Sequence, residues 1–129
     1  SLLTVMAMTA ANSVLVPLQC EFFALEGLSQ LIKTVDRVHK NLNPLLSIDG
    51  IILTMFDKRN KLSTQVAMDV KKHLQEKVFE TMIPRNVRVS EAPSFGMPVI
   101  IYDRKSKGSQ AYLKLAAEIL KKDKSREAA

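Results

Sequence analysis

The feature that most constrains the fold is an alternation of short apolar runs with longer amphipathic stretches. Three runs, residues 13–18, 51–55 and 78–83, are rich in apolar and β-branched side chains and have the length of buried strands. Between them, apolar residues recur every three or four positions, as they do on one face of a helix. This rhythm predicts an α/β fold in which a doubly wound, mostly parallel sheet is flanked by helices.

The same pattern gives the expected bounds of the elements. A short helix is predicted over residues 2–11, and the first and third strands are expected to stop at Pro17 and Pro84. Two helices should bury the side chains of Phe22, Leu25, Leu28, Ile32, Val35, Val38 and Leu42, and of Leu62, Val66, Val70 and Leu74. Residues 99–102 fit either a short edge strand or a buried loop. A last helix, with apolar positions from Tyr112 to Leu120, is expected to fray into a charged tail over residues 121–129.

The charge of the chain is unevenly distributed. The net charge over 129 residues is +6, but residues 1–57 carry three Lys and Arg against five Asp and Glu, whereas residues 58–129 carry sixteen against eight. An acidic partner for the second half is therefore an open possibility. The length is that of one domain, no apolar run approaches the ~20 residues of a membrane span, and a single cysteine fits a reducing cytoplasm.

Several kinds of chemistry have no support in the sequence. The glycines are too far apart to form a phosphate-binding loop, and they lie at positions 27, 50, 96 and 108. His39, His73 and Cys20 lack the spacing of metal ligands, and no serine or cysteine pairs with a histidine in a recognisable triad. We therefore expect no catalytic residue and no metal site in this chain.

Basic residues follow two of the predicted strands. Lys58, Arg59 and Lys61 come after the second strand, and Arg85 and Arg88 come after the third. The carboxyl ends of parallel strands meet at one edge of a sheet, so these cations can converge there. Such a group suits phosphates, of a nucleotide or of a DNA backbone. Scattered solubilising charge remains the alternative, more so for the lysines than for the arginines.

Three longer stretches, 17–27, 53–59 and 83–96, carry a resemblance to a known family. In this order and spacing they resemble the ParA/Soj partitioning ATPases of the deviant Walker, MinD-like P-loop class, over residues 2 to about 120. The resemblance implies that residues 1–129 are the C-terminal portion of a single ParA-type, P-loop NTPase domain. The N-terminal half of that domain, with the phosphate loop and the Asp motif that serves Mg²⁺, would precede Ser1.

The resemblance also implies roles for individual residues. The family holds the adenine base between two strand ends, and the corresponding residues here are Met55, Phe56, Pro84, Arg85 and Asn86. Its nonspecific DNA-binding surface corresponds to Arg59 and Arg88, beside which Lys58 and Lys61 lie in sequence. Ordinary strand-end core is the alternative for Met55 and Phe56, and turn formation is the alternative for Pro84 and Asn86.

In the complete family protein, ATP with Mg²⁺ closes a homodimer that binds DNA nonspecifically, and a ParB/Spo0J-type partner stimulates hydrolysis. The implied role is segregation of chromosomes or plasmids in the cytoplasm, on the nucleoid. This chain alone is expected to bind neither ATP nor Mg²⁺ tightly and to be inactive. Two alternatives stay open. One is a noncatalytic half-domain that binds DNA or a partner, and the other is a MinD-like membrane-associated ATPase. The second is weakened because no apolar anchor follows residues 121–127.

Overall fold

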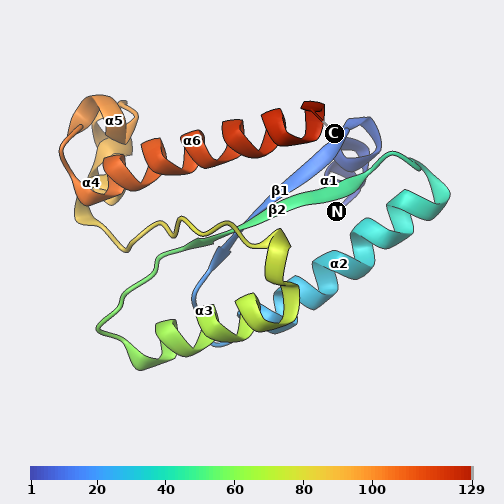
Figure 1. Cartoon of the computed structure of the whole chain (residues 1–129), viewed down its shortest axis with the longest axis horizontal. Coiled ribbons are helices and arrows are strands. Elements are labelled where there is room, and N and C mark those ends of the chain that lie inside the picture. Colours follow the sequence, from blue (N-terminus) through green and yellow to red (C-terminus); the bar gives the residue numbers. More distant parts are fainter. Residues whose placement is uncertain (129) are drawn as a thin grey trace.

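The computed structural model describes residues 1–128 and has the predicted α/β architecture. Strands β1 (Ser13–Gln19) and β2 (Ser47–Thr54) pair in parallel. The helices are α1 (Leu2–Ala10), α2 (Ala24–Asn41), α3 (Lys61–Leu74), α4 (Val87–Glu91), α5 (Val99–Tyr102) and α6 (Lys107–Ala128), with 3₁₀ turns η1 (Gln75–Lys77) and η2 (Ala92–Phe95). Figure 1 shows α6 along one face of the strands and α2 and α3 along the other.

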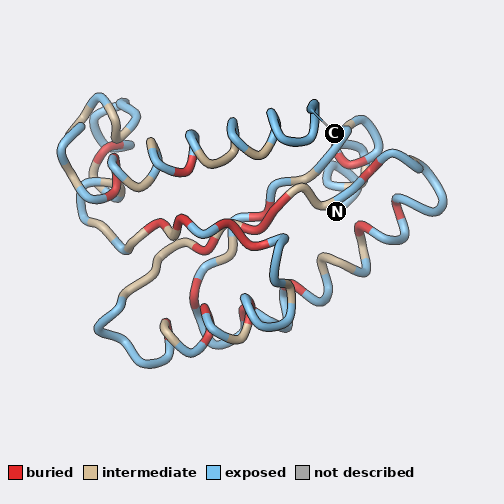
Figure 2. Tube along the Cα trace, viewed as in Figure 1, coloured by how far each residue is buried: buried red, intermediate tan, exposed pale blue. Residues whose placement is uncertain are grey.

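The core lies on both faces of β2. Ile51 and Leu53 of this strand have no exposed surface, and the buried segments in Figure 2 concentrate where the strands cross the molecule. Leu28 of α2 and Val70 of α3 belong to the cluster on one face. Phe79, Ile83 and Leu115 form the cluster under α6 on the other. Since each fully buried aliphatic side chain contributes roughly 1.5–3 kcal/mol, Ile51 and Leu53 make β2 one of the main contributors to the packing.

The first strand does not stop at Pro17, as we expected. β1 continues to Gln19, and Pro17 is paired with Ile52 of β2. Within the described residues β1 has a strand partner on one side only. A proline is tolerated in such a strand because its missing N–H removes no ladder bond when the nitrogen faces the open edge.

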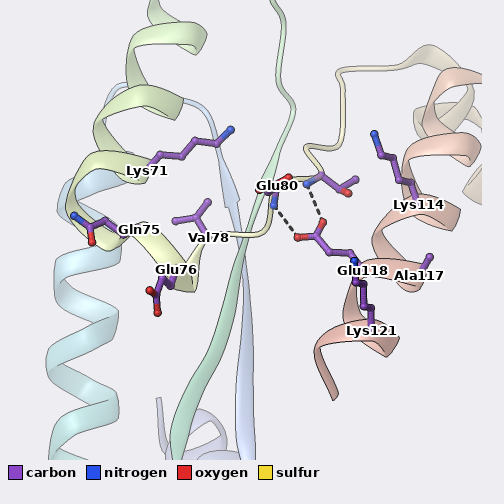
Figure 3. A pocket seen from close by; sticks show the side chains of 10 residues that line it. Lys71, Gln75, Glu76, Val78, Glu80, Lys114, Ala117, Glu118 and Lys121 are labelled. Atoms are coloured by element: carbon purple, nitrogen blue, oxygen red, sulfur yellow. Dashed lines mark hydrogen bonds between the residues drawn. The ribbon is translucent and has the colours of Figure 1, made fainter. Parts of the chain in front are cut away.

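Residues 78–83 do not form the predicted third strand, although they follow the predicted path beside β2. Residues 78–84 run parallel to β2 and touch it through isolated bridges from Ile51 to Val78 and from Phe56 to Pro84. Between these bridges, the backbone N–H groups of Glu80 and Thr81 both donate to the carboxylate of Glu118 on α6, at 2.8 and 2.9 Å (Figure 3). Two consecutive amides that point to one acceptor cannot keep the alternation of a strand, so the ladder is interrupted.

Other corrections concern the end of the chain and the exposure of apolar side chains. Residues 99–102, expected as a strand or loop, form the helical turn α5 after Pro98. The tail does not fray: α6 extends to Ala128, and residue 129 lies outside the described residues. Six large apolar side chains predicted to lie in the core are exposed instead, namely Phe22, Leu25, Leu42, Leu62, Tyr112 and Leu120. Phe22 and Leu42 flank α2, whereas the other four lie within helices.

Contacts at the amino end of β2 explain why the tail stays helical. Lys122 donates to the carbonyl oxygen of Asp49 at 2.8 Å, and Arg126 forms an ion pair with the carboxylate of the same residue. The Lys122 ammonium also lies 4.7 Å from the centroid of the Phe79 ring. These contacts tie the last turns of α6 to the sheet. Among the described helices, none is both long and apolar enough to cross a membrane.

Gly50 provides a test of the packing around β2. A Cβ atom at this position would lie 2.2 Å from the Phe79 ring, whereas one at Gly27, in α2, would meet nothing within 4 Å. We expect Gly50→Ala to lower the free energy of unfolding by about 1–3 kcal/mol, because the buried ring must move. The matched control Gly27→Ala should leave it unchanged or raise it by up to about 1 kcal/mol. Urea titration measures both, and equal stability of the two variants would refute this packing.

Glu118 provides a test of the irregular third segment. Burial acts to raise the pKa of Glu118, but the hydrogen bonds from Thr81 and Glu80 outweigh it, so this pKa lies below its usual value. A lowered pKa stabilises the fold above the unfolded-state pKa, and that contribution is lost as pH falls through the folded-state value. Glu118→Gln should therefore cost about 1 kcal/mol at pH 7 and much less in acid. Urea unfolding at both pH values, with Glu127→Gln as the control on the same helix, checks this. A Glu118→Gln cost that is the same at both would contradict it.

Candidate functional site

The carboxyl end of β2 lies beside the end of the third segment. The N–H of Phe56 donates to the carbonyl of Ile83 at 3.1 Å, and the N–H of Arg85 donates to the carbonyl of Phe56 at 2.9 Å. These bonds bring together two sets of residues that are almost 30 positions apart in sequence. We call them the strand-end site, which consists of Met55, Phe56, Pro84, Arg85 and Asn86.

Met55 has an unusual backbone. Its φ is +53°, in the left-handed region that non-glycine residues rarely adopt. This conformation ends β2 and turns the chain so that Phe56 can bridge to Pro84. The Phe56 ring is half-buried and packs against the main core cluster, so it also serves as strand-end core. Backbone strain of this kind is concentrated at ligand-binding positions in proteins, which makes Met55 the strongest local signal at the site.

Asn86 begins the helix that follows the site. Its Oδ1 accepts hydrogen bonds from the N–H groups of Arg88 and Val89, at 3.1 and 3.4 Å, which is the geometry of an N-cap. The start of α6 lies against this cap, since a Cβ at Gly108 would lie 3.1 Å from the same oxygen. Asn86 therefore does form a turn-type contact. Its amide nitrogen makes no hydrogen bond within residues 1–128 and can donate to a ligand.

The loop after β2 presents its cations to solvent. Asp57 accepts hydrogen bonds from the backbone N–H and the side-chain Nε of Arg59, at 3.0 and 3.2 Å. The side-chain bond, followed by the backbone bond, lowers the pKa of Asp57, and the charge of Arg85 contributes to the shift. The two loops are thus close enough to interact. The Arg59 side chain is 86% exposed, and Lys58 and Lys61 are exposed beside it.

Arg88 has a different environment, one that sequence reasoning missed. Its Nη1 lies 2.9 Å from Oε2 of Glu91 and its Nε lies 3.4 Å from Oδ2 of Asp103. The hydroxyl of Tyr102 donates to the same Oε2 of Glu91 at 2.9 Å. The spacing of Arg88 and Glu91 on α4 is a signal for one of these pairs. Asp103 and Tyr102 come from the end of α5, and nothing in the sequence pattern places them there.

The two basic loops lie at the same end of the molecule but on different sides. In Figure 1, the loop that leads into α3 and the short helices α4 and α5 are found at one end, the first beside α3 and the second beside α6. The loop before α3 and the helices α4 and α5 therefore share one end of the molecule (Figure 1), but the structure shows no contact between Arg59 and Arg88, and their convergence stays a prediction.

A large hollow lies elsewhere on the molecule. A groove of about 1120 Å³ runs over residues 78–81 between α3 and α6, and Figure 3 shows Lys71 on one wall and Lys114 and Lys121 on the other. Glu118 lies within it, but its carboxylate is already used by two backbone amides. The groove and the strand-end site share no residue, and no sequence pattern predicts this hollow.

The strand-end site differs in its chemistry from a metal-binding group or a phosphate-binding loop. Within residues 1–128, no three His, Cys, Asp or Glu side chains gather into a metal-binding group. The four glycines do not form a backbone nest of the kind that holds phosphates. The strand-end site, in contrast, offers apolar side chains, a rigid proline and an amide donor.

Comparisons with known proteins identify relatives of this chain. A family model described as an AAA domain matches residues 1–48. The chain is 62% identical, over 99% of its length, to the chromosome partitioning protein ParA of Caulobacter vibrioides. It is 56% identical, over 92%, to the sporulation initiation inhibitor protein Soj of Bacillus subtilis. The chain spans about half the length of these relatives, 48% and 47%.

A solved structure extends the comparison to the fold. Cobyrinic acid a,c-diamide synthase from Mycobacterium smegmatis, with bound ADP and magnesium, matches with a TM-score of 0.73 and 34% identity. The match covers 97% of this chain and 44% of the other. The fold is that of the P-loop NTPases. With this fold and with 45–62% identity to relatives over nearly its whole length, the chain belongs to the ParA/Soj family of chromosome partitioning proteins and corresponds to their C-terminal half.

Proposed function

We propose that this chain supplies the base-binding edge and the DNA-facing loops of a ParA/Soj-type ATPase that segregates chromosomes or plasmids. The observation that carries the proposal is the juxtaposition of Met55–Phe56 with Pro84–Asn86 at the carboxyl end of β2. Ligands of open α/β sheets bind at this end of the strands. The partitioning role is supported by the names of the family relatives.

In this proposal the adenine base lies between the two strand ends. Phe56 and Pro84 provide apolar surface, the Met55 backbone turns away to leave room, and the amide nitrogen of Asn86 donates to the edge of the base. ATP phosphates and Mg²⁺ would be held by the part of the family protein that this chain does not match. Bound there, they supply the phosphoryl group and its charge neutralisation, while the residues of this chain orient the nucleoside.

The DNA contacts in the proposal are electrostatic. Lys58 and Arg59 lie on an exposed loop, Lys61 is the first residue of α3, and Arg88 lies on the five-residue helix α4. None of them lies on a long recognition helix inserted to read base edges. Cations in such positions bind phosphates and give salt-dependent, sequence-independent affinity. ATP-dependent dimerisation, a ParB/Spo0J-type partner and association with the nucleoid complete the proposed cycle, in which nucleotide and DNA binding are linked.

The base contact can be tested with two matched helix caps. Asn86 caps α4 and Asn60 caps α3 with the same pair of hydrogen bonds, but only Asn86 lies at the strand-end site. The assay uses a joined protein, in which this chain follows the part of the Caulobacter relative that it does not match. Asn86→Ala and Asn60→Ala should each cost about 1 kcal/mol of stability. Only Asn86→Ala should also weaken ATP binding, by about tenfold, the effect of a lost ligand hydrogen bond of ~1.4 kcal/mol. Equal ATP affinities in calorimetry would remove Asn86 from the proposal.

The DNA surface can be tested through salt dependence. Each phosphate contact contributes about 0.9 to the slope of log K against log salt concentration. Arg59→Ala and Arg88→Ala in the joined protein with ATP should each weaken binding to a labelled duplex and reduce the slope by up to that amount. Lys33→Ala on α2, a cation outside both basic loops, is the control. If both arginine variants keep the parent slope in fluorescence anisotropy, the proposed surface is wrong.

A further inference from the structure

The two arginines of the proposed DNA surface are held very differently. Arg59 interacts with one carboxylate, that of Asp57, and its side chain is 86% exposed. Arg88 is 52% exposed and interacts with two carboxylates on different elements, Glu91 on α4 and Asp103 after α5. In the state that the structure describes, the charge of Arg88 is therefore already neutralised by the protein itself.

The two carboxylates are held in place by further contacts. The Tyr102 hydroxyl donates to Glu91, which orients the carboxylate, and the hydrogen bonds from Tyr102 and then Arg88 lower the pKa of Glu91. The Tyr102 ring stacks on Phe95, with centroids 5.0 Å apart and planes inclined by 23°. Ser109 of α6 donates to the carbonyl of Val99, which joins α5 to α6. The carboxylates thus need little reorganisation to hold the guanidinium.

The backbone of Arg88 is fixed as well. Its N–H donates to the Asn86 side chain, so the guanidinium extends from a capped helix and not from a flexible loop. A guanidinium fixed at its base and paired at its tip has two ways to meet a phosphate. It can leave the carboxylates, or it can bring the phosphate close to both of them. The second costs like-charge repulsion, so the carboxylates oppose DNA contact by either route.

We propose that Glu91 and Asp103 form a carboxylate clamp that withholds Arg88 from DNA phosphates, with Tyr102 as the residue that positions Glu91. This inference rests on the proposed DNA-binding function and adds its regulation: the affinity of the surface is set by how often the clamp opens. Arg59 supplies the constant part of the attraction, and Arg88 supplies a part that is available only when its carboxylates release it.

The test measures DNA affinity in variants of the joined protein with ATP. Glu91→Gln and Asp103→Asn remove one negative charge each and keep the side-chain shape. Tyr102→Phe removes only the hydroxyl and keeps the ring stacked on Phe95. All three should bind a labelled duplex about twofold to fivefold more tightly, the range set by an exposed ion pair. The salt slope should steepen by up to about 0.9 as Arg88 reaches a phosphate. Circular dichroism verifies the fold of each variant. If Glu91→Gln or Asp103→Asn disturbs the fold, Tyr102→Phe still tests the proposal, because it changes no charge.

A background of Arg88→Ala distinguishes the clamp from simple loss of negative charge. The clamp predicts that Glu91→Gln has no effect on DNA affinity once Arg88 is absent, and that Glu76→Gln, remote from Arg88, has none in either background. An equal gain from Glu91→Gln with and without Arg88, or no gain with Arg88 present, overturns the clamp. If Arg88→Ala leaves DNA binding unchanged in the parent and also in the Glu91→Gln background, while Arg59→Ala weakens it, the DNA role of Arg88 and the clamp both fail. If neither arginine variant changes the affinity for DNA, the proposed DNA surface is wrong.

Discussion

The burial of β2 between two unequal neighbours is the constraint on which the rest of the structure depends. On one side β1 forms a regular parallel ladder with it, and on the other side residues 78–84 follow it through separate bridges and single hydrogen bonds. Because Ile51 and Leu53 are completely buried, neither neighbour can move away without exposing the core. The irregular neighbour is nevertheless the one that carries the site, since it ends in Pro84, Arg85 and Asn86. In a regular ladder, the N–H groups of Glu80 and Thr81 would not both point to Glu118. The chain would then leave the third segment in a different direction.

Periodicity was sufficient to predict the layers of this fold but not the details that depend on distant side chains. The long helices α2, α3 and α6 and the first two strands follow from local spacing of apolar residues. The failure at residues 78–83 arises from Glu118, about 37 positions later in the chain, whose carboxylate takes two consecutive amides. The failure at Pro17 arises because a pattern cannot tell which edge of a strand is open. Phe22, which precedes α2, and Leu120, which lies within α6, are exposed because spacing predicts an apolar face but not whether another element covers it.

The strand-end site was predictable for a related reason. Parallel strands deliver their carboxyl ends to one edge, so residues after the second and third runs had to meet even though the third run is not a strand. Their identities as base-binding or DNA-binding residues came from the family resemblance and not from the pattern. What neither could provide is the pairing of Arg88 with Asp103 and the contact of Tyr102 with Glu91, which depend on the helical path of residues 87–106.

The anchoring of α6 has a mechanical consequence. This helix has 22 residues and is about 33 Å long at 1.5 Å per residue. Its far end is fastened to Asp49 by Lys122 and Arg126, while its near end lies against the Asn86 cap. Between these ends, Leu115 packs on Phe79 and Ile83, and the Glu118 carboxylate accepts two backbone amides of the third segment. The helix is therefore held at its middle as well as at its ends. It connects the amino end of β2 to the strand-end site as one rigid element.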